Sequence, residues 1–186
     1  MKQTITRKGS FDAGHRVMHE RVKCFNIHGH LYQYELTFEY ETMKDIGYAI
    51  DFKEIKRIAC QYIDDYYDHG FILNPMDTVM FEACVDTKSK FRTMVFGMTI
   101  GAEDIFCNPT AENIAKDLFL SIKYLMAQFH ELKLTNVRLY ETPNCFVDCT
   151  TDSISVAEEL NFTRAYHHQI LDYVKEKGII EYDDRL

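Results

Sequence analysis

The chain has 186 residues and a formal net charge of −8, with 46% hydrophobic and 27% charged residues. These values are typical of a globular protein with a substantial core, so we expect residues 1–186 to form a single domain. The acidic balance disfavours nonspecific nucleic-acid binding, and no segment approaches the roughly 20 apolar residues of a membrane span. The N-terminus lacks the apolar core of a signal peptide, which predicts a cytoplasmic protein with mostly reduced cysteines.

The first two predicted elements are strands that pair with each other. Residues 4–15, TITRKGSFDAGH, have the pattern of a strand. After His30 the sequence alternates strictly between one face and the other. One face carries Tyr32, Tyr34, Leu36, Phe38 and Tyr40, and the other is polar. A period of two indicates a half-buried antiparallel strand.

The next segments have a helical period. Within residues 51–69, one helical face collects Phe52, Ile55, Ala59, Tyr62 and Ile63. A second helix is predicted over residues 108–129, with Thr110 near its N-cap and with Glu112 and Asp117 in its early turns. Its apolar stripe consists of Ile114, Leu118, Ile122 and Leu125.

The remaining segments complete an α+β pattern. Residues 134–143 predict a strand with Val137 and Leu139 on one face, and residues 154–177 predict a final amphipathic helix that ends at Gly178. Residues 76–108 contain strand-like pieces such as FRTMVFGMTI but no clear period. The order is strand, strand, helix, irregular insert, helix, strand and tail, which differs from a βαβ alternation.

A histidine pair opens the second predicted strand. His28 and His30 are two residues apart, so their side chains project to the same side of an extended strand, about 6.5–7 Å apart. A catalytic zinc site takes three protein ligands and leaves one position open. His15, at the end of the preceding strand, can supply the third imidazole, and His19 is its competitor. Three nitrogen ligands suit Zn²⁺, although a His-x-His pair alone is also compatible with a polar turn.

Three further groups are candidates for chemistry beside such a metal. Cys24 could be a fourth ligand of a closed structural site, but we favour a proton-transfer role, because a nearby cation lowers a thiol pKa. Asp68 directly precedes His69 and can tune its basicity. The simpler interpretation is that His69 lies at a helix C-terminus, where it interacts favourably with the helix dipole. Glu141 follows a predicted strand and can accept two hydrogen bonds from the guanidine-like edge of a pterin or guanine, unless it is only a surface carboxylate.

Six motifs follow one another along the chain: FDAGHR, C-x-x-x-HGH-x-Y, GYAIDF, YDHGFILN, NPTAENIA and VRLYET. In this order they resemble the 6-pyruvoyl- and 6-carboxy-tetrahydropterin synthase group, from about residue 3 to 143 with an interruption at 76–108. The resemblance implies the tunnelling fold, a four-stranded antiparallel sheet with two helices on one face. To this the chain adds an insert at about 76–108 and a C-terminal extension at about 145–186. The fourth strand is not evident from periodicity, and either CFVDCTT or part of the insert can supply it.

The resemblance also implies roles for individual residues and an assembly. The zinc ligands would be His15, His28 and His30, and the catalytic residues would be Cys24, Asp68 and His69. Glu141 would anchor the pterin ring, with Thr110 and Glu112 lining its pocket. Subunits of this family join their sheets into a trimeric barrel and stack as homohexamers, with the active sites where subunits meet.

The spacing around the cysteine separates branches of this group. Three residues lie between Cys24 and His28, as in the 6-carboxy enzymes of the queuosine and 7-deazaguanine pathway, whereas 6-pyruvoyl enzymes typically have a longer gap. The resemblance therefore implies a zinc-dependent lyase that converts 7,8-dihydroneopterin triphosphate to 6-carboxy-5,6,7,8-tetrahydropterin and releases acetaldehyde and triphosphate. The alternatives are a 6-pyruvoyl-tetrahydropterin synthase and a non-catalytic pterin-binding protein. The expected partner is the small-molecule pterin triphosphate, with no nucleic acid and no membrane.

Overall fold

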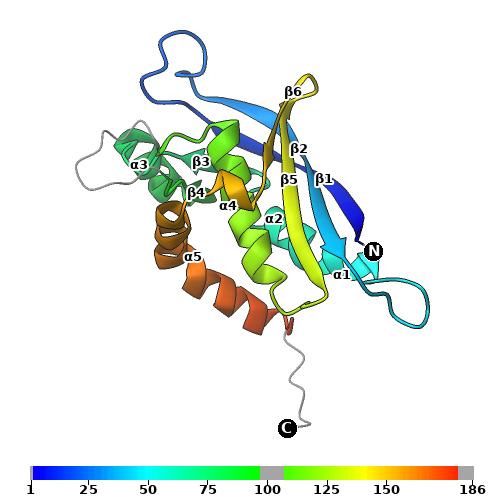
Figure 1. Ribbon diagram of the computed structural model, residues 1–186. Coiled ribbons are helices and arrows are strands. Elements are labelled where there is room, and N and C mark those ends of the chain that lie inside the picture. The colour runs from blue at the N-terminus through cyan, green and yellow to red at the C-terminus, as the bar shows by residue number, and fades with distance from the viewer. Residues whose placement is uncertain (1, 97–106, 180–186) are drawn as a thin grey trace.

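Helices cover one face of a curled sheet in the computed structural model, which describes residues 2–96 and 107–179 (Figure 1). The strands are β1 (Gln3–His15), β2 (His28–Tyr40), β3 (Gly70–Leu73), β4 (Phe91–Thr93), β5 (Leu132–Thr142) and β6 (Cys145–Cys149). The helical segments are α1 (Phe52–Ile55), the π-helical turn η1 (Lys56–Cys60), α2 (Gln61–Tyr66), α3 (Thr78–Thr87), α4 (Ala111–Leu125), the 3₁₀ turn η3 (Thr151–Ser153) and α5 (Val156–Glu176). Within the described residues, the strand order is β4-β3-β1-β2-β5-β6.

The long antiparallel pair β1–β2 forms the middle of the sheet. The two strands pair along their whole length, from Gln3 opposite Tyr40 to His15 opposite His28. The alternation predicted for β2 is confirmed. Its helix-facing side chains Tyr32, Tyr34, Leu36 and Phe38 are buried, together with Val137 and Leu139 from β5. The core of the protein therefore lies between this sheet face and the helices.

The predicted α+β class and antiparallel core are confirmed, but the sheet has six described strands instead of four. β6 is the fourth antiparallel strand, so CFVDCTT was a correct candidate, and residues 145–149 pair with β5 at the edge of the sheet. The additional strands β3 and β4 run parallel to β1 and to each other. They have only four and three residues, which is too short for a period to be visible in the sequence. Residues 97–106 of the insert lie outside the described residues.

The first predicted helix is interrupted by a π-helical turn. Residues 52–66 run through α1, η1 and α2, and four of the five predicted core positions are buried. Phe52 is the exception, with 50% of its surface exposed, and Ile58 is buried although it was not predicted. A π-turn takes up one extra residue, so it rotates the apolar face before it relative to the face after it. A single 3.6-residue period therefore does not hold through the whole of residues 52–66.

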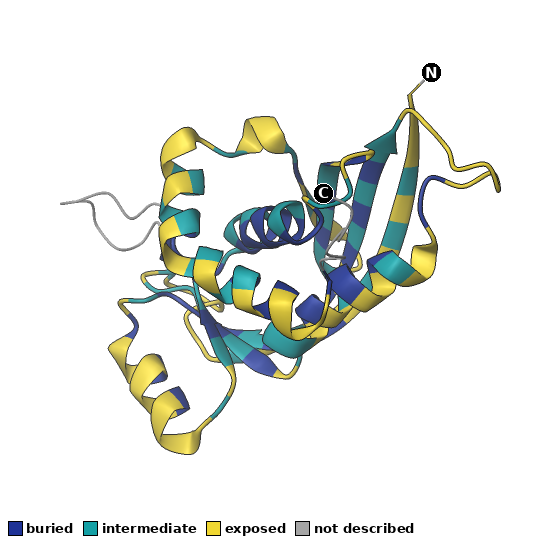
Figure 2. Ribbon diagram, turned by 90° about the horizontal axis from the view of Figure 1, so that it is seen from below, coloured by how far each residue is buried: buried dark blue, intermediate teal, exposed yellow. Residues whose placement is uncertain are grey.

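α4 lies between the sheet and α5 (Figures 1 and 2). Thr110 is its N-cap and accepts a hydrogen bond from the Asn113 backbone N–H, as predicted, and its predicted apolar stripe is buried. α5 begins after Ser155, which forms a capping box with Glu158, and it ends just before Gly178. Because α4 is covered on both sides, polar side chains on it are buried too.

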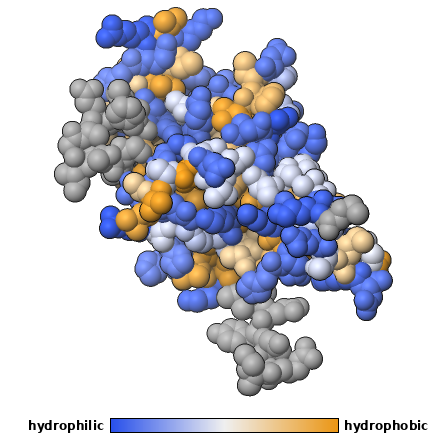
Figure 3. Space-filling view, in the orientation of Figure 1, coloured by the Kyte–Doolittle hydropathy of each residue, from blue (hydrophilic) through white to orange (hydrophobic). Residues whose placement is uncertain are grey.

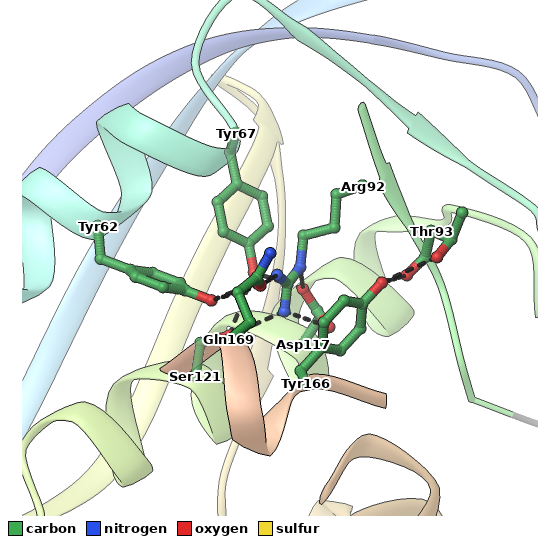
Figure 4. Close-up of polar contacts among 8 residues, drawn as sticks. All are labelled: Tyr62, Tyr67, Arg92, Thr93, Asp117, Ser121, Tyr166 and Gln169. Atoms are coloured by element: carbon green, nitrogen blue, oxygen red, sulfur yellow. Dashed lines mark hydrogen bonds and ion pairs between the residues drawn. The ribbon is translucent and has the colours of Figure 1, made fainter. Parts of the chain in front are cut away.

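One such side chain, Asp117, is the centre of a buried polar network (Figure 4). Its carboxylate accepts hydrogen bonds from Arg92 of β4 and from the Tyr67 hydroxyl, and neither Arg92 nor Asp117 is more than 2% exposed. The Arg92 guanidinium also donates to Gln169 of α5 over 3.1 Å. The network thereby joins the insert, α4 and α5 to Tyr67, the residue before Asp68. The sequence places Asp117 in an early turn of this helix, but it does not reveal that the side chain is buried against Arg92.

The surface of the described residues is largely polar on the face seen in Figure 1. Hydrophilic side chains predominate there, and apolar ones form small separate areas (Figure 3). Scattered apolar residues of this kind are normal on soluble surfaces. Within residues 2–96 and 107–179, no helix combines the length and apolar character needed to cross a bilayer.

Candidate active site

The pairing of β1 with β2 brings three histidines together at one end of the sheet. His15 lies directly opposite His28, and His30 follows on the same side of β2. His15 Nε2 and His28 Nε2 are 3.1 Å apart, and one ring nitrogen of each histidine lies within 4.8 Å of the others. All three belong to the helix-facing side of their strands, next to Tyr32. The structure therefore assembles the predicted triad from two strands.

Backbone carbonyls orient two of these rings. His15 Nδ1 lies 2.7 Å from the carbonyl oxygen of Pro109, and His28 Nδ1 lies 2.7 Å from that of Asn26. A carbonyl can only accept, so each Nδ1 carries the proton and each Nε2 keeps its lone pair. This is the usual arrangement of metal-binding histidines. Sequence reasoning missed both supporting carbonyls, because main-chain acceptors leave no trace in residue type.

The environment of the triad favours the neutral form of two of its imidazoles, those of His15 and His30. Burial, with smaller effects from the neighbouring His28 and His30, lowers the pKa of His15 to about 4, although the hydrogen bond to the Pro109 carbonyl raises it. Burial also lowers the pKa of His30, partly offset by the charge of Glu141. Neutral imidazole is the metal-binding form, and three nitrogens with one side left open fit Zn²⁺. Within the described residues, neither His19 nor Cys24 belongs to this cluster, so the geometry favours the open site over a closed one.

Glu141 lies beside the histidines, at the end of β5. Its Oε1 is 3.7 Å from His15 Nε2 and 4.0 Å from His30 Nε2. The side chain is partly exposed, so its carboxylate can still reach a ligand. Sequence reasoning placed Glu141 only at a strand end; the register of β5 against β2 puts it on the same sheet face as the triad.

Cys24 lies in the loop between β1 and β2, which contacts at its ends fix in place. Val17 N–H donates to the Cys24 carbonyl over 2.7 Å, and Arg16 stacks over the Phe25 ring at 5.2 Å. Arg16 is itself held by a two-point ion pair with Asp77, the N-cap of α3 in the insert. Burial raises the pKa of the Cys24 thiol, and the charges of Glu20 and Glu141 raise it further. In the metal-free chain the thiol is therefore protonated at neutral pH.

Asp68 and His69 form the predicted pair, but on the other face of the sheet. His69 Nδ1 donates to Asp68 Oδ2 over 2.6 Å, and Asp68 Oδ1 accepts from the Asp12 backbone N–H over 2.8 Å. His69 lies next to Asp12, whose side chain points away from the helices, and 79% of the His69 side chain is exposed. The hydrogen bond from His69 to Asp68 raises the pKa of the imidazole. Within one chain, this pair and the histidine triad face opposite sides of the sheet.

The segment before α4 contacts the triad through its backbone. Pro109 supplies the carbonyl that orients His15, and Thr110 follows as the helix cap. The buried Asn108 bonds both the N–H and the carbonyl of Met18, over 2.9 and 2.8 Å, and so joins this segment to the end of β1. Glu112 is exposed in the first turn of α4. The roles of Thr110 and Glu112 toward a ligand remain predictions.

Comparisons with known proteins place these features in a family context. A family model described as 6-pyruvoyl tetrahydropterin synthase matches residues 4–152. The chain is 36% identical to a 6-carboxy-5,6,7,8-tetrahydropterin synthase of Rickettsia bellii over 143 residues, which cover 77% of this chain and 96% of the relative. It is 30% identical over 161 residues to the protein of the same name from Aquifex aeolicus, covering 76% and 94%. The structure of Caenorhabditis elegans 6-pyruvoyl tetrahydropterin synthase shares the fold, with a TM-score of 0.56, 22% identity and coverage of 81% and 96%.

Proposed function

The chain belongs to the 6-pyruvoyl tetrahydropterin synthase family, and from this premise we propose that it is a 6-carboxy-5,6,7,8-tetrahydropterin synthase. The reaction would convert 7,8-dihydroneopterin triphosphate and water to 6-carboxy-5,6,7,8-tetrahydropterin, acetaldehyde and triphosphate. The names of the Rickettsia and Aquifex relatives and the short spacing from Cys24 to His28 support this branch. The pathway would be queuosine or 7-deazaguanine biosynthesis.

The observation that carries the proposal is the triad of His15, His28 and His30 with Glu141 beside it. The three imidazoles would hold a zinc ion through their Nε2 atoms, with Nδ1 of His15 and His28 fixed by backbone carbonyls. When bound, such an ion supplies Lewis-acid polarisation of substrate oxygens. Glu141 would accept hydrogen bonds from the pterin ring and so hold the three-carbon side chain of the substrate over the triad, which is a positioning effect.

The proton-transfer groups would come from two subunits. Cys24 is on the loop next to the triad, and burial and nearby carboxylates raise its pKa, so it needs a positive neighbour to act as a base. Asp68 and His69 are on the opposite sheet face of the same chain. We therefore expect a second copy to present its Asp68–His69 pair to Cys24, in keeping with the homohexamer implied by the family resemblance.

Complementation between inactive variants tests this arrangement. Cys24→Ala and His69→Ala should each retain zinc and lose turnover. Unfolding and refolding the two variants together should restore activity, because mixed oligomers contain some sites with both an intact Cys24 and an intact His69. A mixture that stays inactive, although mixed oligomers form, would show that both groups act within one chain or that the pair has no catalytic role.

The nearest alternative is a 6-pyruvoyl-tetrahydropterin synthase, which is supported by the fold shared with the C. elegans enzyme. That reaction releases triphosphate without acetaldehyde, so the products separate the two. A non-catalytic pterin-binding protein is less well supported, because the chain retains Cys24, Asp68 and His69 together with the triad. It would bind a dihydropterin without converting it.

A further inference from the structure

The hydroxyl of Tyr32 is a buried polar group without a partner. Tyr32 is 0% exposed, and its Oη has no hydrogen bond to any part of the chain that the structure describes. Among the described residues, four other buried side-chain atoms have no hydrogen-bond partner. They belong to Arg7, Gln128, Asn136 and His167, and each of these residues is partly exposed as a whole. Because buried hydroxyls are nearly always paired, the exception at Tyr32 needs an explanation.

The surroundings of this hydroxyl connect it to the active site. The Tyr32 ring contacts His15 edge-on with centroids 6.0 Å apart, and it contacts His30 at 5.6 Å. The same two histidines lie 3.7 and 4.0 Å from Glu141 Oε1 through their Nε2 atoms. The Tyr32 ring therefore packs against two members of the triad, which in turn contact the carboxylate.

Packing alone does not explain a tyrosine at this position. The ring stacks on Phe11 with centroids 5.1 Å apart, a contact that phenylalanine would make equally well. An unpaired buried hydroxyl lowers stability relative to an apolar group of the same shape. A phenol kept at such a cost beside an active site is expected to gain its partner from a ligand.

Resting on the function proposed above, we propose that the Tyr32 hydroxyl donates a hydrogen bond to an oxygen of the substrate's three-carbon side chain. Glu141 would then hold the ring of the pterin while Tyr32 holds its side chain. The position of Glu141 suggests how the substrate reaches the phenol. The Glu141 carboxylate lies within 4.0 Å of His15 and His30, whose rings also contact Tyr32. When Glu141 turns to the pterin ring, space opens beside the phenol.

Two unreactive ligands test this division of roles with zinc-free protein. Neopterin carries the trihydroxypropyl side chain, and pterin lacks it. Tyr32→Phe should weaken neopterin binding about three- to tenfold, the usual effect of one hydrogen bond, and leave pterin binding unchanged. Glu141→Gln should weaken both ligands alike. Zinc affinity should be unchanged in Tyr32→Phe, because the phenol is not a ligand.

Tyr34→Phe is the matched control. Tyr34 lies two residues further along the same face of β2 and is equally buried, but its hydroxyl bonds to Cys60. Tyr34→Phe should lower the midpoint of thermal unfolding and leave both ligand affinities unchanged, whereas Tyr32→Phe should leave the midpoint unchanged or raise it.

Three outcomes would overturn the inference. Equal affinities of Tyr32→Phe and wild type for neopterin would remove the proposed contact, and an equal loss for both ligands would make it a general effect on the site. A fall in the unfolding midpoint of Tyr32→Phe would give the hydroxyl a structural partner instead. Wild-type protein that binds neither compound would refute the proposed function itself, and this inference with it.

Discussion

Replacing Asp117 with asparagine keeps the shape of the side chain but removes the charge that compensates the buried guanidinium of Arg92. Arg92 and Asp117 are 2% and 0% exposed, and the guanidinium donates to Asp117 through two nitrogens. The other hydrogen bonds of Arg92, to Ser121, Tyr62 and Gln169, are made to neutral groups over 3.1–3.3 Å, and its remaining contacts are with aromatic rings such as Tyr166. They cannot replace a carboxylate, so the substitution leaves an unpaired charge in the core.

The expected decrease in the free energy of unfolding is large for a protein of this size. Breaking a buried ion pair by removing one partner typically costs about 3–5 kcal/mol. For a chain of this length, about 1 kcal/mol corresponds to a shift of roughly 2–4 °C in Tm, so Asp117→Asn should lower Tm by about 6–20 °C. Thermal and urea unfolding of the metal-free protein, followed by circular dichroism, measure the change.

The exposed pair Arg138–Asp148 supplies the control. It is also bound through two nitrogens, but its side chains are 33% and 38% exposed. Surface pairs contribute about 0–1 kcal/mol, so Asp148→Asn should change Tm by no more than a few degrees. If Asp117→Asn were no more destabilising than Asp148→Asn, the reasoning from burial would be refuted.

Three further predictions follow from single positions. Gly178 has a φ of 58° and open space around it, so Gly178→Ala should cost about 1–2 kcal/mol from backbone strain alone; an unchanged unfolding midpoint would contradict this. Because Asp68 raises the pKa of His69, Asp68→Asn should lower the NMR titration midpoint of the His69 ring, and an unaltered midpoint would rule out the pairing in solution. The stabilisation from this pair should be present below the unfolded-state histidine pKa of about 6.5 and lost as the pH rises through the folded-state pKa. His28→Ala should weaken zinc binding by more than the roughly 10- to 100-fold typical of losing one supporting hydrogen bond, as measured by competition with a chelator.

The periodic parts of the fold were predictable because each buries one face against a regular neighbour. The β2 alternation beginning at Tyr32 and the α4 stripe at Ile114 and Leu118 show this directly. Prediction failed where distant parts of the chain or an irregular helical turn determine whether a side chain is buried. Asp117 is buried against Arg92 of β4, and Phe52 is exposed as the first residue of a helical segment that a π-turn interrupts.

The sequence predicted which residues form the candidate site, but it predicted only part of their arrangement in space. The two-residue period of β2 gives the convergence of His28 and His30, and the pairing register adds His15. The Asp68–His69 pair lies beside Asp12, whose place in the alternation of β1 is on the opposite face, and the dipeptide alone does not reveal this. The sequence places Tyr32 on one face of the strand but does not reveal its unpaired phenol, because a tyrosine in such a stripe looks the same whether or not its hydroxyl has a partner.

Product stoichiometry tests the central claim most directly. Zinc-loaded protein is incubated with 7,8-dihydroneopterin triphosphate, and acetaldehyde, triphosphate and the pterin product are quantified together. The proposed function predicts one acetaldehyde and one 6-carboxy-5,6,7,8-tetrahydropterin for each triphosphate released, and none of the three from Cys24→Ala. Triphosphate without acetaldehyde would contradict the proposal in favour of the pyruvoyl reaction, and no release from protein that binds the substrate would contradict catalysis altogether.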